Sequence, residues 1–224
     1  MGNGINKVLP NLYLGNFKDA RDPELLAQNN ITHILSIHDT AAPILEDMTY
    51  LCISAADHSK QNLIQYFRQS FVFIHESRLK GEGCLVHCVA GASRSVTLVV
   101  AYIMTVTGRG WVESLAAVRS ARPCAGPNLG FLRQLEEFEN FELAQYRAWW
   151  TERYGKDSFN DAEDVQNLLT TRSVSPALET SGTQSGTQSG TWSGTQSGTQ
   201  SGTQSGTQSG TRSRTQSGTQ SGTR

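Results

Sequence analysis

The chain has 224 residues and a formal net charge of −1 at pH 7, with Lys and Arg scattered along it. This near-neutral balance gives no overall field to attract nucleic acid, so we expect no nucleic-acid partner. Its four cysteines, at positions 52, 84, 88 and 124, show no metal-ligand spacing, so we expect neither a zinc site nor a disulfide framework. No secretory signal stands out, which favours a reducing cytoplasmic setting. No apolar run reaches the ~18 residues of a membrane span, so we expect none.

The N-terminal residues contain a candidate lipidation site. Gly2 follows Met1 directly, as in N-myristoylation signals, although Asn6 stands where that pattern usually has Ser or Thr. A single acyl chain binds membranes weakly and reversibly. We therefore expect residues 1–6 to be an acylation segment, and the protein to divide between the cytoplasm and the inner face of the plasma membrane, with the nucleus left open.

Strand and helix patterns then alternate along the chain. Residues 8–14 predict an edge hairpin, Asp22 and Pro23 predict the start of a short helix that ends at Ala27, and the ranges 31–37, 49–53 and 84–88 predict buried strands. Helical periodicity predicts helices at 62–80, 94–106, 111–121 and 128–154. This alternation indicates an α/β domain whose sheet is covered on both faces.

The composition changes near Thr170. We expect one domain at residues 7–155, then a linker at 156–180 that includes a short helix at 161–169. Residues 181–224 repeat Ser-Gly-Thr-Gln, with Trp192 and Arg212 as interruptions. This repeat has no apolar face to bury and much glycine, so it cannot offset the entropy lost on ordering. It predicts a disordered tail that acts as a neutral spacer.

A phosphate-binding loop is predicted between the strand at 84–88 and the helix that begins at Arg94. The backbone N–H groups of such a loop can surround an anion, because the first N–H groups of a helix lack internal partners and the helix dipole favours negative charge there. Gly91 permits the tight turn, and the planar fork of Arg94 matches two phosphoryl oxygens. The residues expected to bind phosphate are Val89, Ala90, Gly91, Ala92, Ser93 and Arg94.

Cys88 lies at the start of this loop, with His87 before it. A thiol near a helix N-terminus and cationic side chains ionises more easily, so Cys88 is a candidate nucleophile. The alternative is a buried structural thiol that ends a core strand. His87 is either a charged neighbour of the thiol or only a hydrogen-bonding support for the loop.

The run His-Cys-x-x-Gly-x-Ser-Arg-Ser at residues 87–95 resembles the signature of the dual-specificity branch of the cysteine-dependent protein phosphatases. The similarity extends from about residue 7 to residue 154, and the N-terminus resembles that of an N-myristoylated subgroup. It implies the cysteine-phosphatase fold, with a central mixed, mostly parallel sheet flanked by helices. It also implies that Cys88 takes the phosphoryl group, that Arg94 clamps it, and that Ser95 helps the thiolate to leave. The alternative for Ser95 is a hydroxyl that satisfies a backbone group at the helix start.

A proton donor is also needed, because the departing phenol or alcohol must be protonated. Asp57 follows the strand at 49–53, where the resemblance places the general acid on a loop, but loop residues Asp39, Glu46 and Asp47 compete with it, and composition does not rank them. By resemblance, Asn128 braces the phosphate loop; it is also a good helix N-cap, and both roles can hold together.

The resemblance implies a metal-independent enzyme without a cofactor that acts on phosphotyrosine and phosphoserine or phosphothreonine in proteins, with kinases of mitogen-activated pathways as partners. The loop has no extra Lys or Arg, which ranks phosphoinositide and RNA substrates lower. A catalytically weak scaffold that binds kinases is the alternative function. Cys84 and Cys124 are candidates to trap an oxidised Cys88 as a disulfide, or else they are small buried residues.

Overall fold

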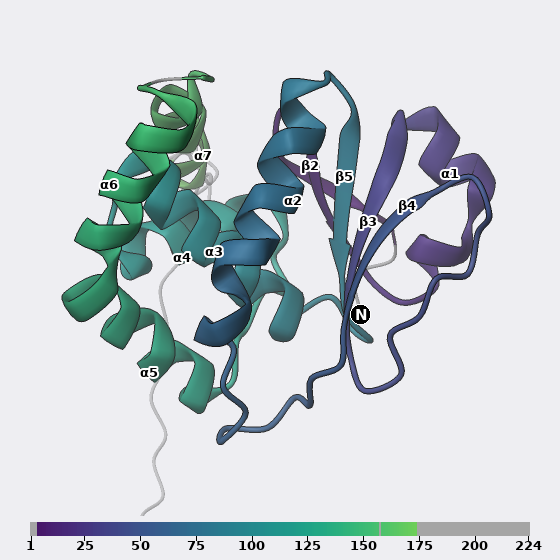
Figure 1. Ribbon diagram of the computed structural model, residues 1–224, viewed down its shortest axis with the longest axis horizontal. Coiled ribbons are helices and arrows are strands. Elements are labelled where there is room, and N and C mark those ends of the chain that lie inside the picture. Colours follow the sequence, from purple (N-terminus) through teal and green to yellow (C-terminus); the bar gives the residue numbers. More distant parts are fainter. Residues whose placement is uncertain (1–3, 157, 174–224) are drawn as a thin grey trace, which may run out of the picture. The chain divides into compact units, whose positions relative to one another are not determined.

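The computed structural model describes residues 4–156 and 158–173, and within these residues it forms one mixed sheet of five strands flanked by helices (Figure 1). The strand order is β1-β2-β5-β3-β4. Only β1 and β2 pair antiparallel; the other neighbours are parallel. The strands are β1 (Asn6–Leu9), β2 (Leu12–Gly15), β3 (Ile31–Ile37), β4 (Thr49–Ile53) and β5 (Gly83–His87). The predicted fold class and the edge hairpin are confirmed.

Alternate residues of the central strands enter two separate cores. Leu35 and Val86 point into the larger core, whereas their neighbours Ile34 and Leu85 point into the smaller one. This is the period-two alternation of a strand that is buried on both faces. The short helix α1 (Pro23–Gln28) covers the smaller core through Leu26, with the Asp22 side chain as its predicted N-cap.

The larger core lies under the remaining helices, which gather on the other side of the sheet (Figure 1). Of these, α3 runs through the middle and is buried from Arg94 to Thr105. Most of its residues are apolar, and Thr97 and Thr105 bond back to carbonyls of the preceding turn, which suits a helix enclosed by others. The helices are α2 (Phe67–Leu79), α3 (Arg94–Thr107), α4 (Trp111–Ala121), α5 (Leu129–Glu137), α6 (Leu143–Tyr154) and α7 (Asp161–Ser173), with short turns η1 (Asp19–Arg21) and η2 (Ile64–Tyr66).

The prediction of one continuous helix over 128–154 is wrong in detail. A π-helical segment, η3 (Phe138–Glu142), separates α5 from α6. Phe138 and Leu143 are both buried, and they are five residues apart. An α-helix brings residues four apart onto one face, which would place Glu142 in the core, so the wider turn lets both apolar residues point inward.

Two other boundaries differ from the prediction. The helix expected at 62–80 begins with the tight turn η2 and becomes α-helical only at Phe67. The strand expected at 84–88 ends at His87, so that Cys88 already belongs to the loop. Just before η2, Leu63 N donates to the Gln134 side chain of α5, and just after β5, Val89 O accepts from Phe17 N. Local sequence patterns do not reveal such distant partners.

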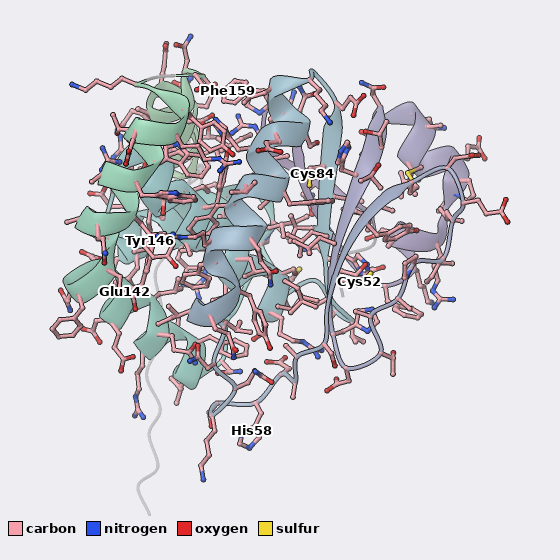
Figure 2. All side chains as sticks on the ribbon, in the orientation of Figure 1. Cys52, His58, Cys84, Glu142, Tyr146 and Phe159 are labelled. Atoms are coloured by element: carbon pink, nitrogen blue, oxygen red, sulfur yellow. The ribbon has the colours of Figure 1, made fainter. Side chains whose placement is uncertain are left out.

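The last helix, α7, is longer than predicted and packs against α3 and α4. Its first residue, Asp161, receives two hydrogen bonds from the Arg78 guanidinium of α2, at 2.7 and 2.9 Å, and both side chains are almost fully buried. Arg78 also donates to the Tyr102 hydroxyl of α3 at 2.7 Å. Phe159, seen in Figure 2, lies under the same guanidinium at 4.2 Å. This buried network joins α2, α3 and α7.

Trp150, near the end of α6, packs into the larger core. Trp150 contacts the His75 ring of α2 at a centroid distance of 4.6 Å and the Tyr102 ring at 5.9 Å. Across the described ranges, no single helix has the length and apolar character of a membrane span; α3 and α4 reach them only as a pair bent by 120°. Gly2 and the repeat at 181–224 lie outside the described residues, whereas the end of the expected acylation segment is described and its last residue, Asn6, already begins β1.

We predict that Asp161→Ala lowers the free energy of unfolding by about 3 to 5 kcal/mol, because it leaves the Arg78 charge buried without its partner. Urea denaturation of the full chain measures this change. Glu113→Ala is the matched control, since it breaks the exposed Arg109–Glu113 pair on the surface, which is worth less than ~1 kcal/mol. Equal losses in the two variants would show that Asp161 does not anchor α7.

Candidate active site

The predicted site lies where β5 ends and α3 begins. Four parts of the chain meet there: the loop 88–93, the residues that follow β3, the residues that follow β4, and the start of α5. Because β3, β4 and β5 are parallel, their carboxyl ends lie at the same edge of the sheet, which is where open α/β sheets usually bind ligands. The fold therefore brings Cys88, Asp57 and Asn128 together from distant parts of the sequence.

The loop's carbonyl groups are turned away from its centre by a buried arginine. Arg122, fully buried, donates from Nε to the Gly91 carbonyl at 2.7 Å and from Nη2 to the Ala90 carbonyl at 3.4 Å. Its Nη1 is fixed by the Asn6 side chain at 2.7 Å and the Gly4 carbonyl at 3.2 Å. The N-terminal hairpin thus supports the loop through this guanidinium.

The remaining carbonyls of the loop are bound in the same way by donors outside it. They are Cys88 O, bound by His87 Nδ1 at 3.0 Å; Val89 O, by Phe17 N at 3.0 Å; Ala92 O, by Gly126 N at 2.8 Å; and Ser93 O, by Thr97 N at 3.0 Å. Since each peptide group points its N–H opposite to its C=O, the N–H groups are left to face the centre. The result is a concave ring of donors that suits an anion.

Gly91 is required by this geometry. Its φ of +68° is in the left-handed region, which favours glycine. A Cβ atom at this position would also overlap the Gly15 carbonyl of β2 and the Arg122 guanidinium. Any side chain at position 91 would therefore displace either the end of β2 at Gly15 or the Arg122 guanidinium that orients the loop.

The Cys88 thiol lies at the base of the ring, 3.2 Å from the Ser95 hydroxyl. Burial by itself raises the pKa of this thiol, but hydrogen bonds from the Ser95 hydroxyl and from the N–H groups of Ser95 and Gly91, together with the Arg94 charge, outweigh burial and lower it. The Ser95 hydroxyl is fully buried and faces the sulfur. Ser93, the N-cap residue of α3, makes no side-chain bond to the helix backbone.

The structure decides between the two interpretations of His87. Burial lowers the pKa of His87 to about 4, so the ring is neutral near pH 7 and gives the thiolate no positive charge. Its Nδ1 donates to the Cys88 carbonyl, so its Nε2 accepts from the Ser36 hydroxyl of β3 at 2.6 Å. His87 therefore supports the loop by hydrogen bonding alone, and the interpretation as a charged neighbour is wrong.

Arg94 is held from behind. Its Nη1 donates to the Asp39 carboxylate and to the Ala55 carbonyl, both at 3.0 Å. Its Nε is buried and has no hydrogen-bond partner among the residues that the structure describes. One side of the guanidinium is thus fixed by the protein, and Nε is a donor on it that a phosphoryl oxygen can engage.

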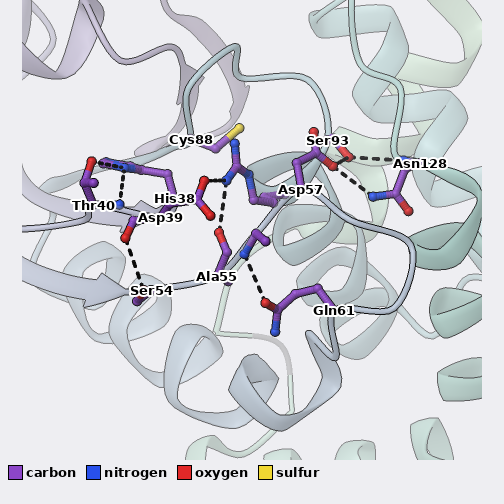
Figure 3. A network of polar contacts seen from close by, with 12 residues as sticks. His38, Asp39, Thr40, Ser54, Ala55, Asp57, Gln61, Cys88, Ser93 and Asn128 are labelled. Carbon is purple, nitrogen blue, oxygen red and sulfur yellow. Dashed lines mark hydrogen bonds and ion pairs between the residues drawn. The ribbon is translucent and has the colours of Figure 1, made fainter.

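Asp57 is placed over the loop by two neighbours (Figure 3). Its Oδ1 accepts from the Ser93 hydroxyl and from the Asn128 side-chain amide, both at 2.8 Å. Asn128 N in turn donates to the Ser93 hydroxyl at 3.1 Å, and the Asn128 side chain caps α5 at Phe131 N. The expected N-cap role of Asn128 is therefore present, whereas its side-chain amide binds Asp57 and only its backbone N–H reaches the loop, at Ser93. Because both bonds to Asp57 end on Oδ1, Oδ2 remains for a proton.

The other carboxylates are separated from this position. Asp39 pairs with Arg94. Glu46 and Asp47 are exposed in the connection before β4, and within the described part of the chain no hydrogen bond joins them to the loop. Asp57 is thus the carboxylate that the fold links to both Ser93 and Asn128.

Sequence reasoning missed the residues that hold the site in place. Arg122, Ser36 and Gln134 are single polar residues without a local motif, and their partners lie far away in sequence. Arg122, for example, is 31 residues from Gly91. Asp39 was considered only as a proton donor, whereas it pairs with Arg94.

The candidate redox partners of Cys88 differ in position. Cys84 lies within β5 (Figure 2), four residues before Cys88, and four residues of extended chain span about 13 Å. A disulfide needs Cα atoms within about 7 Å, so Cys84 is not a partner. Cys124 is exposed in the connection that contacts Ala92 through Gly126, and its pairing with Cys88 stays a prediction. In the described residues, no group of three or more His, Cys, Asp or Glu side chains is placed to hold a metal ion.

The sheet topology and the loop define a phosphatase class, and comparison with known proteins agrees. The sequence model described as "Dual specificity phosphatase, catalytic domain" matches residues 12–141. The chain therefore belongs to the dual specificity phosphatase family, and by this membership and its close relatives it is a dual specificity protein phosphatase.

Individual relatives cover most of the chain. Dual specificity protein phosphatase 22-B of Danio rerio is 72% identical over 179 residues, which are 80% of this chain and 98% of the relative. Dual specificity protein phosphatase 22 of Homo sapiens is 60% identical over 174 residues, 78% of this chain and 95% of the relative. The crystal structure of DUSP15 is similar with a TM-score of 0.66 and 51% identity, covering 70% of this chain and all of that one. The resemblance stated from the sequence is confirmed.

We predict that Ser95→Ala raises the pKa of the Cys88 thiol, because a hydrogen bond to the charged sulfur is lost. Alkylation by iodoacetate requires the thiolate, so its rate against pH should move to higher pH. Ser120→Ala, which removes a half-buried hydroxyl on α4, is the control and should leave the profile unchanged. An unshifted profile in Ser95→Ala would show that this hydroxyl does not stabilise the thiolate.

Proposed function

We propose that this phosphatase hydrolyses phosphotyrosine, phosphoserine and phosphothreonine in proteins, without a metal, through a cysteinyl-phosphate intermediate. The observation that carries the proposal is the Cys88 thiol of lowered pKa at the base of a ring of N–H groups, next to an arginine whose Nε has no partner among the described residues. A carboxylate, Asp57, is tied to the rim of the same ring.

In the first step, the Cys88 thiolate attacks phosphorus and the bond from phosphorus to the substrate oxygen breaks. The loop N–H groups and Arg94 neutralise the charge on the phosphoryl oxygens, and they do so at fixed positions, which avoids reorganisation during reaction. Asp57 gives its proton from Oδ2 to the departing oxygen. The products are the free phenol or alcohol and a phosphorylated cysteine.

In the second step, water attacks the phosphorus and the phosphorus–sulfur bond breaks. The Asp57 carboxylate takes a proton from this water, and the Ser95 hydroxyl donates a hydrogen bond to the sulfur as it leaves as a thiolate. Inorganic phosphate is released and Cys88 returns to its initial state. The 3.2 Å separation between Cys88 and Ser95 supports this role of the hydroxyl.

The substrates that fit best are phosphorylated side chains of proteins. The loop's own side chains are small and uncharged apart from Arg94, so they offer no cations for a multiply phosphorylated lipid or RNA end. Kinases of mitogen-activated pathways are the partners that we propose, by analogy with the family resemblance. The assembled Cys88, Arg94 and Asp57 favour catalysis over a scaffold that only binds.

The full chain should cleave p-nitrophenyl phosphate and phosphotyrosine peptides in the presence of a chelator, and vanadate should inhibit it. Cys88→Ser should abolish turnover of both substrates. Asp57→Ala should reduce turnover of the phosphotyrosine peptides, whose leaving group needs protonation, by about 10²- to 10⁴-fold, the typical contribution of general acid–base catalysis. Acid quenching with ³²P-labelled substrate should trap phosphate on Cys88. Full turnover in Cys88→Ser, or no trapped label, would reject the covalent route.

We further propose that Gly2 is myristoylated and that the protein divides between the cytoplasm and the inner face of the plasma membrane, because one acyl chain gives only reversible binding. Intact mass spectrometry of protein from eukaryotic cells should show the added acyl mass, and Gly2→Ala should move the membrane fraction into the cytosol. An acetylated or unmodified N-terminus in the unaltered chain would contradict this.

A further inference from the structure

The connection that contains Asp57 is fastened to α5 by one side chain. Gln134 accepts from Leu63 N through Oε1 at 2.8 Å and donates through Nε2 to Gln61 O at 2.7 Å. Its amide therefore satisfies a backbone donor and a backbone acceptor two residues apart. A single amide that makes both bonds fixes the position and the direction of this segment on the helix.

The first turn of α5 lies directly against the same connection. A Cβ atom at Gly130 would overlap the Ser59 carbonyl, so the helix and the loop approach as closely as backbone atoms allow. Asn128, just before the helix, reaches Asp57. The helix α5 thus contacts the connection at three points, through Asn128, Gly130 and Gln134.

A second amide carries the constraint toward Asp57. The Gln61 side chain accepts from Ala56 N at 3.0 Å through Oε1, and Ala56 precedes Asp57 directly. Gln61 itself is the residue whose carbonyl Gln134 binds. Successive hydrogen bonds therefore lead from α5 to the backbone beside Asp57.

Asp57 needs this support because it is an exposed residue in a connection that has no regular structure. A misplacement of about 1 Å at a catalytic group can cost on the order of 100-fold in rate. The bonds of Asp57 to Ser93 and Asn128 orient its carboxylate, but they do not hold the backbone that carries it.

We propose that Gln134 is a positioning residue that keeps the Asp57 connection docked on α5, so that the carboxyl group reaches the departing oxygen. This inference rests on the proposed function, in which Asp57 is the general acid. Gln134 touches neither substrate nor Asp57, and it acts through Gln61 and the loop backbone.

The test uses Gln134→Leu in the full chain with a series of aryl phosphates of rising leaving-group pKa. A poor leaving group, phenol, depends on protonation, whereas a strongly electron-poor phenol departs without it. We expect kcat/KM for phenyl phosphate to fall about tenfold or more, part of the usual general-acid contribution, with little change for the most activated ester. Gln145→Leu, at an exposed glutamine on α6, is the control and should change neither value.

A double-mutant cycle tests whether Gln134 acts through Asp57. In the Asp57→Asn background the carboxyl proton is already lost, so Gln134→Leu should cause no further decrease. Gln134→Glu keeps the acceptor for Leu63 N but turns a carboxylate oxygen, in place of the N–H donor, toward the Gln61 carbonyl; we expect the same dependence on the leaving group. Gln134→Glu replaces Gln134→Leu in the aryl phosphate series if thermal unfolding shows that Gln134→Leu does not fold.

An equal decrease for all leaving groups, or a decrease that persists in the Asp57→Asn background, would overturn the role of Gln134. These results differ from a failure of the proposed function itself. If the proposed function itself failed, Asp57→Asn alone would leave turnover at the level of the unaltered enzyme, or Cys88→Ser would keep its turnover.

Discussion

From Cys88 to Ser93, every backbone carbonyl of the active-site loop is bound by a donor outside the ring, and the N–H groups face its centre as a consequence. The remaining features of the site depend on this orientation. In the proposed mechanism the ring stabilises the sulfur anion and, by the same donors, the oxygens of a phosphoryl group. Arg122 binds two of these carbonyls and is tied to the N-terminal hairpin, so the first strands of the sheet help to form the site.

The charges around the ring are arranged so that Arg94 is its principal cation. His87 is neutral, with a pKa lowered to about 4 by burial, and it contributes hydrogen bonds instead. Asp39 pairs with one edge of Arg94, and another donor of Arg94 stays unoccupied within the described part of the chain. The thiolate is therefore stabilised mainly by nearby hydrogen bonds, which do not weaken with ionic strength as the attraction of a surface charge does.

Local patterns were enough to predict the α/β fold, the strands and the loop, because alternation, helical periodicity and the spacing from Cys88 to Arg94 are properties of short segments. They were not enough for features set by distant contacts. The docking of α7 through Asp161 and the partners of Arg122 and Gln134 depend on residues tens of positions away. The charge of His87 also could not be predicted from the sequence, because it depends on how deeply the fold buries the ring.

The outward-facing side chains of the loop have an evolutionary consequence. Val89 is half exposed and Ala90 is also exposed, while the groups that face the anion belong to the main chain, which every amino acid except proline supplies equally. Replacements at these two positions can alter the surface presented to a polypeptide without changing the phosphate-binding groups. New substrate preferences can therefore arise by drift at the rim of the pocket while the chemistry beneath it is inherited intact.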